Sequence, residues 1–337
     1  MKKKISLKLT KIFFSLILFL VVLEVITRLF GIKPFAHFDD KAIEAQINKN
    51  FKNYMCNEDS IGIIPCESCE RIIGQADQLP FKVTHLKDGS RYCGKVDSTK
   101  NILLITGDSN IHGEGVDDTS HVGYKLQSLL SDFHVINRAI PGSGNISQLL
   151  VLKESLKNYK PNIVIATYAS YHNERNIFGR SIKKVFMIPK SKVNYFKFPY
   201  MQLENDTFKI KFTRYNYKPV PLSNYLALSE FINILIEKNE YRTMKADLVT
   251  KEIWRQYISL CRSNKIKLCV LVLTKDKKTE KIVHFLRKNK IEIIRANIND
   301  SLTLKPIDPH PNKIGHTFLK NVILNKLVKI GWVKNTN

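Results

Sequence analysis

Five short apolar runs alternate with longer stretches from residue 101 onward, and this alternation limits the possible fold more than any other feature of the sequence. The runs are NILLIT at 101–106, HVINRAI at 134–140, NIVIATYA at 162–169, KLCVLVLT at 267–274 and IEIIRAN at 291–297. Each run has the length of a strand, and helix-length stretches separate them, such as residues 278–290 before the last run. Alternating strands and helices predict a parallel sheet covered by helices on both faces.

The alternation stops between Glu174 and about Asp247, where the sequence becomes rich in Tyr, Phe, Lys and Pro. Within this insertion, Asn205 and Asp206 separate YMQL from TFKIKF and predict a hairpin turn. An insertion after the third strand of an open α/β sheet emerges near the carboxyl ends of the strands, where ligands bind. Both a lid or substrate platform and a surface excursion without function are consistent with it.

The N-terminus carries several lysines ahead of an apolar run from Ile12 to Phe30. At about 1.5 Å per residue, this run spans roughly the hydrocarbon thickness of a bilayer. Glu24 and Arg28 lie near its exit end, so they can pair on one helical face or reach the interface. The basic flank places the N-terminus in the cytoplasm and everything after Gly31 outside it, in the periplasm or on the outer face. No small-x-small cleavage site follows, so we predict a single-pass membrane anchor rather than a cleaved signal peptide.

These features predict four parts in the chain. They are a cytoplasmic basic tail at 1–11, a transmembrane anchor at 12–30, a loop-rich, cysteine-containing stalk or cap at 31–98, and the α/β domain at 99–333 with its insertion at about 174–247.

Four of the six cysteines lie in the segment ahead of the α/β domain, namely Cys56, Cys66, Cys69 and Cys93. Disulfides persist outside the cytoplasm, so links among these four are predicted, with three possible connectivities. A zinc site is the weaker interpretation because the segment has only one Cys-x-x-Cys pair. Cys261 and Cys269 are predicted to be small core residues.

The formal net charge of +24 admits nucleic acid, an anionic membrane face or an acidic polymer as partner. The lysines are scattered through the chain rather than gathered into one tract. Nucleic-acid binding is therefore not expected.

Polar motifs follow the predicted strands, and the first is Gly107-Asp108-Ser109 after NILLIT. A serine at this turn can act as a nucleophile, and its backbone N–H can face a developing oxyanion. The same tripeptide is also consistent with a helix cap. The second motif, from Asn137 to Gly142, places a glycine where the backbone can approach a substrate and donate to an oxyanion.

The third motif is Tyr171-His172-Asn173-Glu174 after NIVIATYA, where the Asn173 amide is a further candidate donor or simply part of a turn. The fourth is DPHPNKIGH at 308–316, ahead of an apolar-periodic terminal helix. Here His310 has the carboxylate of Asp308 two residues upstream. These are the base and the orienting acid that a serine nucleophile needs.

The motifs GDS at 107–109, N-x-x-x-x-G at 137–142, Asn173 and HPNxxGH at 310–316 resemble, in order, the four sequence blocks of the SGNH, or GDSL, hydrolase family. The stretches GDSNIHGEGV and VINRAIPGSGN also resemble the membrane-anchored bacterial envelope subgroup. The resemblance implies a flavodoxin-like three-layer α/β/α sandwich. It also implies Ser109 as nucleophile, with Gly142 and Asn173 joining the Ser109 N–H in an oxyanion hole. No cofactor or metal is expected.

Two positions depart from the family pattern. Most members place the acid three residues before the histidine, where this chain has Ile307; Asp308 lies two before, a spacing found in acetylating relatives from polysaccharide export. Asp300 is a distant alternative. The family's third block is usually Gly-x-Asn-Asp. Here Tyr171 and Glu174 replace its ends, so His172 and Asn176 compete with Asn173 for the donor role.

The resemblance implies acyl transfer through an acyl-enzyme. With water as acceptor, the protein is an esterase that acts on O-acetyl or other acyl groups of envelope carbohydrate or lipid. With a sugar hydroxyl as acceptor, it is an O-acyltransferase of an extracytoplasmic polysaccharide, served by a membrane partner that delivers the acyl donor. A non-catalytic envelope-binding protein with the same fold is the third possibility. His316 is expected to be structural, and His112 to be a surface turn residue or part of the pocket lining.

Overall fold

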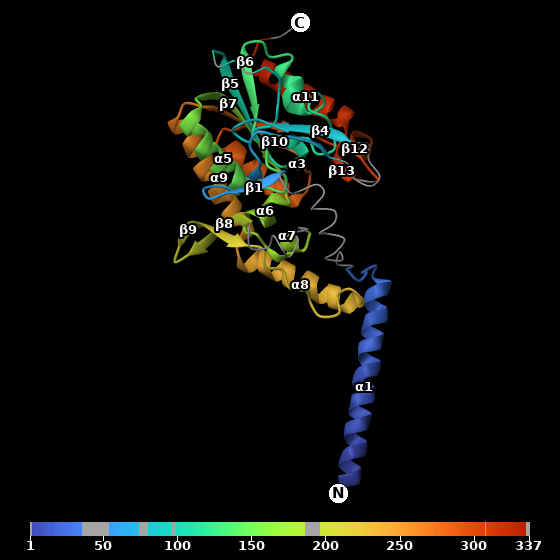
Figure 1. The fold of residues 1–337 in the computed structure, drawn as a ribbon. Helices are drawn as coiled ribbons and strands as arrows, with labels where there is room; N and C mark the ends of the chain where they lie inside the picture. Colours follow the sequence, from blue (N-terminus) through green and yellow to red (C-terminus); the bar gives the residue numbers. More distant parts are fainter. Residues whose placement is uncertain are drawn as a thin grey trace.

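The structure is a computed structural model that describes residues 2–35, 54–73, 80–95, 97, 99–185, 196–306 and 308–334. A long N-terminal helix, α1 (Lys2–Leu29), extends away from a body of strands and helices (Figure 1). The body holds the sheet that the alternating apolar runs predicted.

The central sheet has five strands in the order β11-β10-β7-β5-β6. All four neighbouring pairs are parallel. The strands are β5 (Asn101–Thr106), β6 (Phe133–Asn137), β7 (Pro161–Tyr168), β10 (Lys267–Val272) and β11 (Glu292–Arg295). The predicted parallel α/β sheet is confirmed.

Helices cover both faces of this sheet (Figure 1). One face packs against α5 (Asn145–Asn158), α9 (Ala246–Ser263) and α10 (Lys277–Lys288), and the other against α4 (Val122–Gln127) and α11 (Lys313–Lys329). Successive residues of β5 alternate between the two cores, with Leu104 on the α5 side and Leu103 and Ile105 on the α11 side. Because both faces are buried, the central strands are apolar almost throughout, and the three-layer arrangement is confirmed.

The described part of the segment predicted as a loop-rich stalk or cap forms two antiparallel hairpins. They consist of β1 (Met55–Glu58) with β2 (Gly62–Pro65), and β3 (Cys69–Ile73) with β4 (Phe81–His85). Tyr54, Phe81 and Val83 are buried in the same core as α5 and α9. This segment is therefore packed into the body. Residues 36–53 and 74–79 of the predicted stalk lie outside the described residues.

The cysteines of this segment do not all enter disulfides. Cys56 is bonded to Cys66, which closes a short loop across the β1–β2 hairpin. Cys93 is instead a buried thiol whose Sγ donates to the carbonyl of Arg91. The prediction that all four cysteines are linked is therefore wrong for Cys93. Cys261 and Cys269 are buried in the core, as predicted.

The described residues of the insertion form three helices and a hairpin. They are α6 (His172–Asn176), α7 (Arg180–Val185), β8 (Lys197–Glu204), β9 (Thr207–Arg214) and α8 (Ala227–Thr243). The hairpin turn at Asn205 and Asp206 is confirmed, since β8 and β9 pair from Glu204 and Thr207 outward. Both turn residues have positive φ, 45° and 58°, as primed hairpin turns require.

Helix α1 contains a segment, Lys8–Leu29, with a mean hydropathy of 2.5 and no part of its apolar window buried in the protein. Its 22 residues are long enough to cross a bilayer, and a signal sequence has the same character. The predicted pairing within the apolar run is present, with 2.7 Å between Arg28 Nε and Glu24 Oε1.

Candidate active site

The turn after β5 positions Ser109 at the start of the short helix α3 (Ser109–His112). Asp108 is the N-cap, and its side chain accepts a hydrogen bond from the backbone N–H of Asn110 at 3.0 Å. A Cβ on Gly107 would lie 2.8 Å from Thr167 Oγ1 and 2.9 Å from the Ile111 Cβ. Only glycine fits there, so the tight approach of α3 to β7 depends on this residue.

Ser109, His310 and Asp308 form a hydrogen-bonded row. Ser109 Oγ lies 2.8 Å from His310 Nε2, and His310 Nδ1 makes a short hydrogen bond with Asp308 Oδ1. The same carboxylate oxygen accepts from the His310 backbone N–H at 2.7 Å. Asp308 and His310 lie on β13 (Asp308–Pro311), which pairs with β12 (Thr303–Leu304). The Asp-x-His spacing thus lets one strand present both the acid and the base.

The charges around His310 favour its protonated form. Burial opposes the imidazolium, but the hydrogen bond and charge of Asp308, helped by the charges of Glu114 and Asp108, outweigh it and raise the pKa of His310. Burial by itself would raise the pKa of Asp308. The hydrogen bonds with His310 and its charge lower this pKa by more, so the net pKa of Asp308 is depressed. An ionised acid beside a basic imidazole is the charge arrangement of a general base.

The alternative acid, Asp300, lies elsewhere. Its carboxylate is 2.8 Å from Lys305 Nζ, and 78% of its side chain is exposed. Ile307, the usual family position of the acid, lies outside the described residues.

The glycine loop after β6 packs directly against the turn formed by Gly107, Asp108 and Ser109. We call this turn the nucleophile turn, after the predicted role of Ser109. The carbonyl of Gly107 accepts from the Ile140 N–H at 2.9 Å and from Ser143 Oγ at 3.0 Å. Gly142 lies between these two contacts with φ of 75°, a conformation that favours glycine. The structure therefore brings the Gly142 loop beside the turn that carries Ser109.

Asn173, the predicted side-chain oxyanion donor, makes hydrogen bonds with three other side chains. Its Nδ2 donates to Tyr241 Oη at 3.0 Å and to Asp247 Oδ1 at 3.1 Å, while its Oδ1 accepts from Tyr168 Oη at 3.0 Å. The side chain is fully buried. These contacts join α6 to β7, α8 and α9, and they direct the amide of Asn173 at other side chains. The role of Asn173 in an oxyanion hole stays a prediction.

The two competing residues are also engaged elsewhere. Asn176 Nδ2 donates to Thr250 Oγ1 at 2.9 Å, and its Oδ1 accepts from the N–H of Ile146 at 3.0 Å. His172 Nε2 lies 3.1 Å from Asp108 Oδ2. His172 and Tyr171, which both contact Asp108 Oδ2, are therefore the members of the third motif that reach the nucleophile turn.

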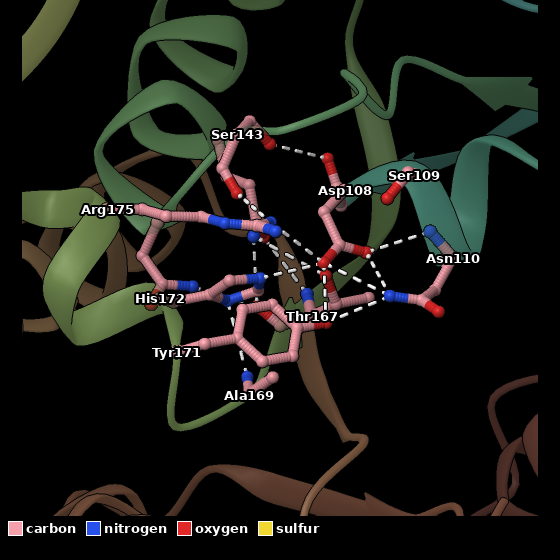
Figure 2. A network of polar contacts seen from close by, with 12 residues as sticks. Asp108, Ser109, Asn110, Ser143, Thr167, Ala169, Tyr171, His172 and Arg175 are labelled. Carbon is pink, nitrogen blue, oxygen red and sulfur yellow. Dashed lines mark hydrogen bonds and ion pairs between the residues drawn. The ribbon is translucent and has the colours of Figure 1, made fainter. Parts of the chain in front are cut away.

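Figure 2 shows the polar network around Asp108, which the sequence analysis did not identify. The fully buried carboxylate contacts His172, Tyr171 Oη at 2.7 Å and Arg175 Nη1 at 3.2 Å. Arg175 Nη1 also donates to the carbonyl of Ser143 at 2.9 Å, in the glycine loop. Burial raises the pKa of Asp108, but its bonds and charges from His172 and Arg175 lower it more, so the carboxylate is ionised. The one feature of the sequence that could have indicated this network is Arg175, a charged residue that directly follows the third motif on α6.

A second buried cluster lies behind α3. His112 is fully buried, with Nε2 3.0 Å from His85 Nε2 and Nδ1 3.3 Å from Tyr54 Oη. Tyr54 also donates a short hydrogen bond to Glu114. His112 thus joins α3 to β4 and to the residue before β1, which corrects its prediction as a surface turn or pocket-lining residue.

His316 is fully buried on α11, and its Nδ1 accepts from the N–H of Val122 at the start of α4. Burial, together with nearby positive charge from Arg91 and Lys125, lowers the pKa of His316 to about 3. Its position is structural. Across the described ranges, no group of three or more His, Cys, Asp or Glu side chains could hold a metal ion.

No family model and no curated protein matches the sequence. Among solved structures, TesA is 13% identical with a TM-score of 0.41, over 68% of this chain and 99% of TesA. The esterase EstA from Pseudoalteromonas sp. is 12% identical with a TM-score of 0.41, over 68% of this chain and 98% of EstA. The acetylxylan esterase Axe2 from Geobacillus stearothermophilus is 12% identical with a TM-score of 0.37, over 72% of this chain and all of Axe2 (100%).

The chain is similar to these proteins at the level of the fold only.

Proposed function

We propose that this chain is a serine esterase of the SGNH type, with Ser109 as nucleophile, His310 as general base and Asp308 as the orienting acid. The observation that carries the proposal is the row of contacts from Ser109 Oγ through the His310 ring to Asp308. A serine hydroxyl is a weak nucleophile by itself, and a hydrogen-bonded imidazole oriented by a carboxylate activates it.

In the first half-reaction, Ser109 Oγ attacks the ester carbonyl carbon while its proton moves to His310 Nε2. The imidazolium is stabilised by Asp308 through Nδ1. The carbonyl oxygen becomes an oxyanion, for which the N–H groups of Ser109 and Gly142 are the proposed donors. Collapse of the tetrahedral intermediate breaks the ester C–O bond, and His310 returns the proton to the departing alcohol. This leaves an acyl group on Ser109.

In the second half-reaction, His310 removes a proton from water, and the resulting attack on the acyl-enzyme releases the acid and restores Ser109. An acceptor hydroxyl in place of water would make the same residues an acyltransferase. The preferred substrates are acyl esters of envelope carbohydrate or lipid, because helix α1 is proposed to anchor the chain in a membrane with the α/β domain on the extracytoplasmic side. The Cys56–Cys66 disulfide supports that side, since such bonds persist outside the cytoplasm.

The test is hydrolysis of p-nitrophenyl acetate by the full chain in detergent micelles. Serine-dependent turnover is expected, with Ser109→Ala lowering kcat by about 10⁴-fold or more. Ser263→Ala is the matched control because its hydroxyl lies on the exposed side of α9, bonded to the carbonyl of Ser259. Equal turnover by the Ser109→Ala and unaltered chains would overturn the proposal.

The kinetics also separate the acceptors. An esterase releases p-nitrophenol continuously. A transferase without its acceptor releases one equivalent per Ser109 and then stops, because the acyl-enzyme persists. A folded chain that is neither acylated by the ester nor labelled at Ser109 by a fluorophosphonate would be a binding protein.

A further inference from the structure

Helix α8 has its polar side turned inward and its apolar side turned outward. Glu230 and Asn233 are 6% and 1% exposed. The large apolar side chains on the opposite side are exposed, namely Phe231 (38%), Ile232 (43%), Leu235 (48%) and Ile236 (43%). A helix on the surface of a soluble domain has the reverse arrangement. We call these four side chains the outer face of α8.

Polar contacts fix the helix in this orientation. Lys184 of α7 contacts the Glu230 carboxylate. The Nζ of Lys184 is also 3.8 Å from Oε1 of Glu237. Arg180 Nε donates to Asn233 Oδ1 at 2.6 Å. Rolling the helix to bury the outer face would expose these groups and break the contacts, so the described part of the body leaves the apolar side of α8 exposed.

The first turn of α8 is held by α1. The Glu24 carboxylate accepts hydrogen bonds from the backbone N–H groups of Ala227 at 2.9 Å and Leu228 at 2.8 Å. Arg28 Nη2 donates to the carbonyl of Tyr225 at 3.0 Å. A carboxylate at this position satisfies N–H groups that have no acceptor within the helix and complements the helix dipole. The charged pair inside the apolar run of α1 is therefore a docking site for α8.

This contact sets the depth of α8 along α1. Glu24 precedes Leu29 by five residues, which is about 7.5 Å of helix from the end of the apolar segment. In Figure 1, α8 runs from this end of α1 along the side of the body nearest to α1. Leu222 and Tyr225, which are 61% and 72% exposed, lie just before α8 and extend the apolar surface towards α1.

We propose that the outer face of α8 lies in the interfacial layer of the same bilayer that α1 crosses. The inference rests on the proposed anchoring by α1. An amphipathic helix in a membrane interface places its apolar face about 5–10 Å into the boundary between headgroups and acyl chains, which matches the depth of Glu24. The bilayer is preferred to a second protein because the apolar surface is continuous with the lipid-facing surface of α1. The insertion after β7 thus holds the body against the membrane surface and does not act as a lid.

The experiment uses the full chain reconstituted in phosphatidylcholine vesicles, with a photoreactive benzoylphenylalanine at one position. The three variants carry it at Leu235 on the outer face, at Asn321 as an exposed control on α11, which lies on the part of the body away from α1 (Figure 1), and at Phe19 in the middle of α1. After irradiation, adducts are identified by mass. Leu235 is half exposed, so the substitution leaves the packing of α8 against the body intact.

Lipid adducts are expected at Phe19 and at Leu235, with the yield at Leu235 at least about fivefold above that at Asn321, because the outer face of α8 reaches the acyl boundary whereas α11 does not. Adducts at Phe19 together with chain-to-chain links or no adducts at Leu235 would overturn the seating of α8 and leave the anchor intact. No lipid adduct at Phe19 would overturn the anchor, and the seating of α8 with it.

Discussion

Ser109 and His310 are 201 positions apart in the sequence, and 2.8 Å separates Ser109 Oγ from His310 Nε2. Ser109 follows the central strand β5, whereas His310 lies on the short β13 before the last helix. Nothing local joins them. Their contact results from the packing of β13 beside α3, which follows the carboxyl end of β5.

Asp308→Asn is expected to lower kcat/KM by up to about 10⁴-fold, because an amide neither holds the imidazole in the required tautomer nor stabilises the imidazolium. Since Asp308 raises the pKa of His310, and the neutral imidazole is the active form, its loss moves the acid limb of the pH–rate profile to lower pH. Asp300→Asn is the matched control. Unchanged kinetics for Asp308→Asn would remove Asp308 from the proposed triad.

Glu114→Gln is expected to shift the acid limb to lower pH with little change in the maximal rate. Burial alone would raise the pKa of Glu114, but its bonds with His112 and Tyr54 and the nearby charge of His310 lower it to about 2, so the group is charged at working pH. That charge contributes to the raised pKa of His310. The measurement is kcat/KM from pH 5 to 9, compared with the exposed Glu67→Gln. An unmoved midpoint, or one displaced to higher pH, would contradict this electrostatic role.

Arg175→Met is expected to reduce the free energy of unfolding by about 3 kcal/mol, because it removes the positive charge that pairs with the buried Asp108 carboxylate. Chemical denaturation of the full chain in micelles measures the change. The control is Arg255→Met, whose exposed pair with Glu252 is expected to contribute less than about 1 kcal/mol. Equal losses in the two variants would mean that the Asp108 network does not stabilise the nucleophile turn.

Removing the disulfide by Cys56→Ser with Cys66→Ser is expected to cost about 2–3 kcal/mol, because the bond closes a short loop in the unfolded chain. Mass spectrometry of nonreduced peptides from the membrane-bound chain should show Cys56 linked to Cys66 and Cys93 as a thiol. Finding Cys56 and Cys66 reduced in the native chain would argue against the extracytoplasmic side.

The sequence was a good guide to the sheet and to the contact between Asp308 and His310. Strands buried on both faces are continuously apolar, so their order along the chain could be read directly. Asp308 and His310 are two residues apart on one strand, and their contact is local. The contacts of Asn173 could not be predicted, because its partners Tyr241 and Asp247 lie on α8 and α9, far along the chain.

The sequence by itself determined the parallel α/β architecture, the hairpin at Asn205 and Asp206, the apolar N-terminal helix and the local placement of the Asp308–His310 pair. These features depend on residue periodicity or on neighbours within a few positions. Only the tertiary structure decided that Asp108 is held by His172 and Arg175, that His112 is buried, and that Glu24 of α1 caps α8. Those relationships join elements distant in sequence, and a charged or polar residue does not reveal its partner until packing brings the two together.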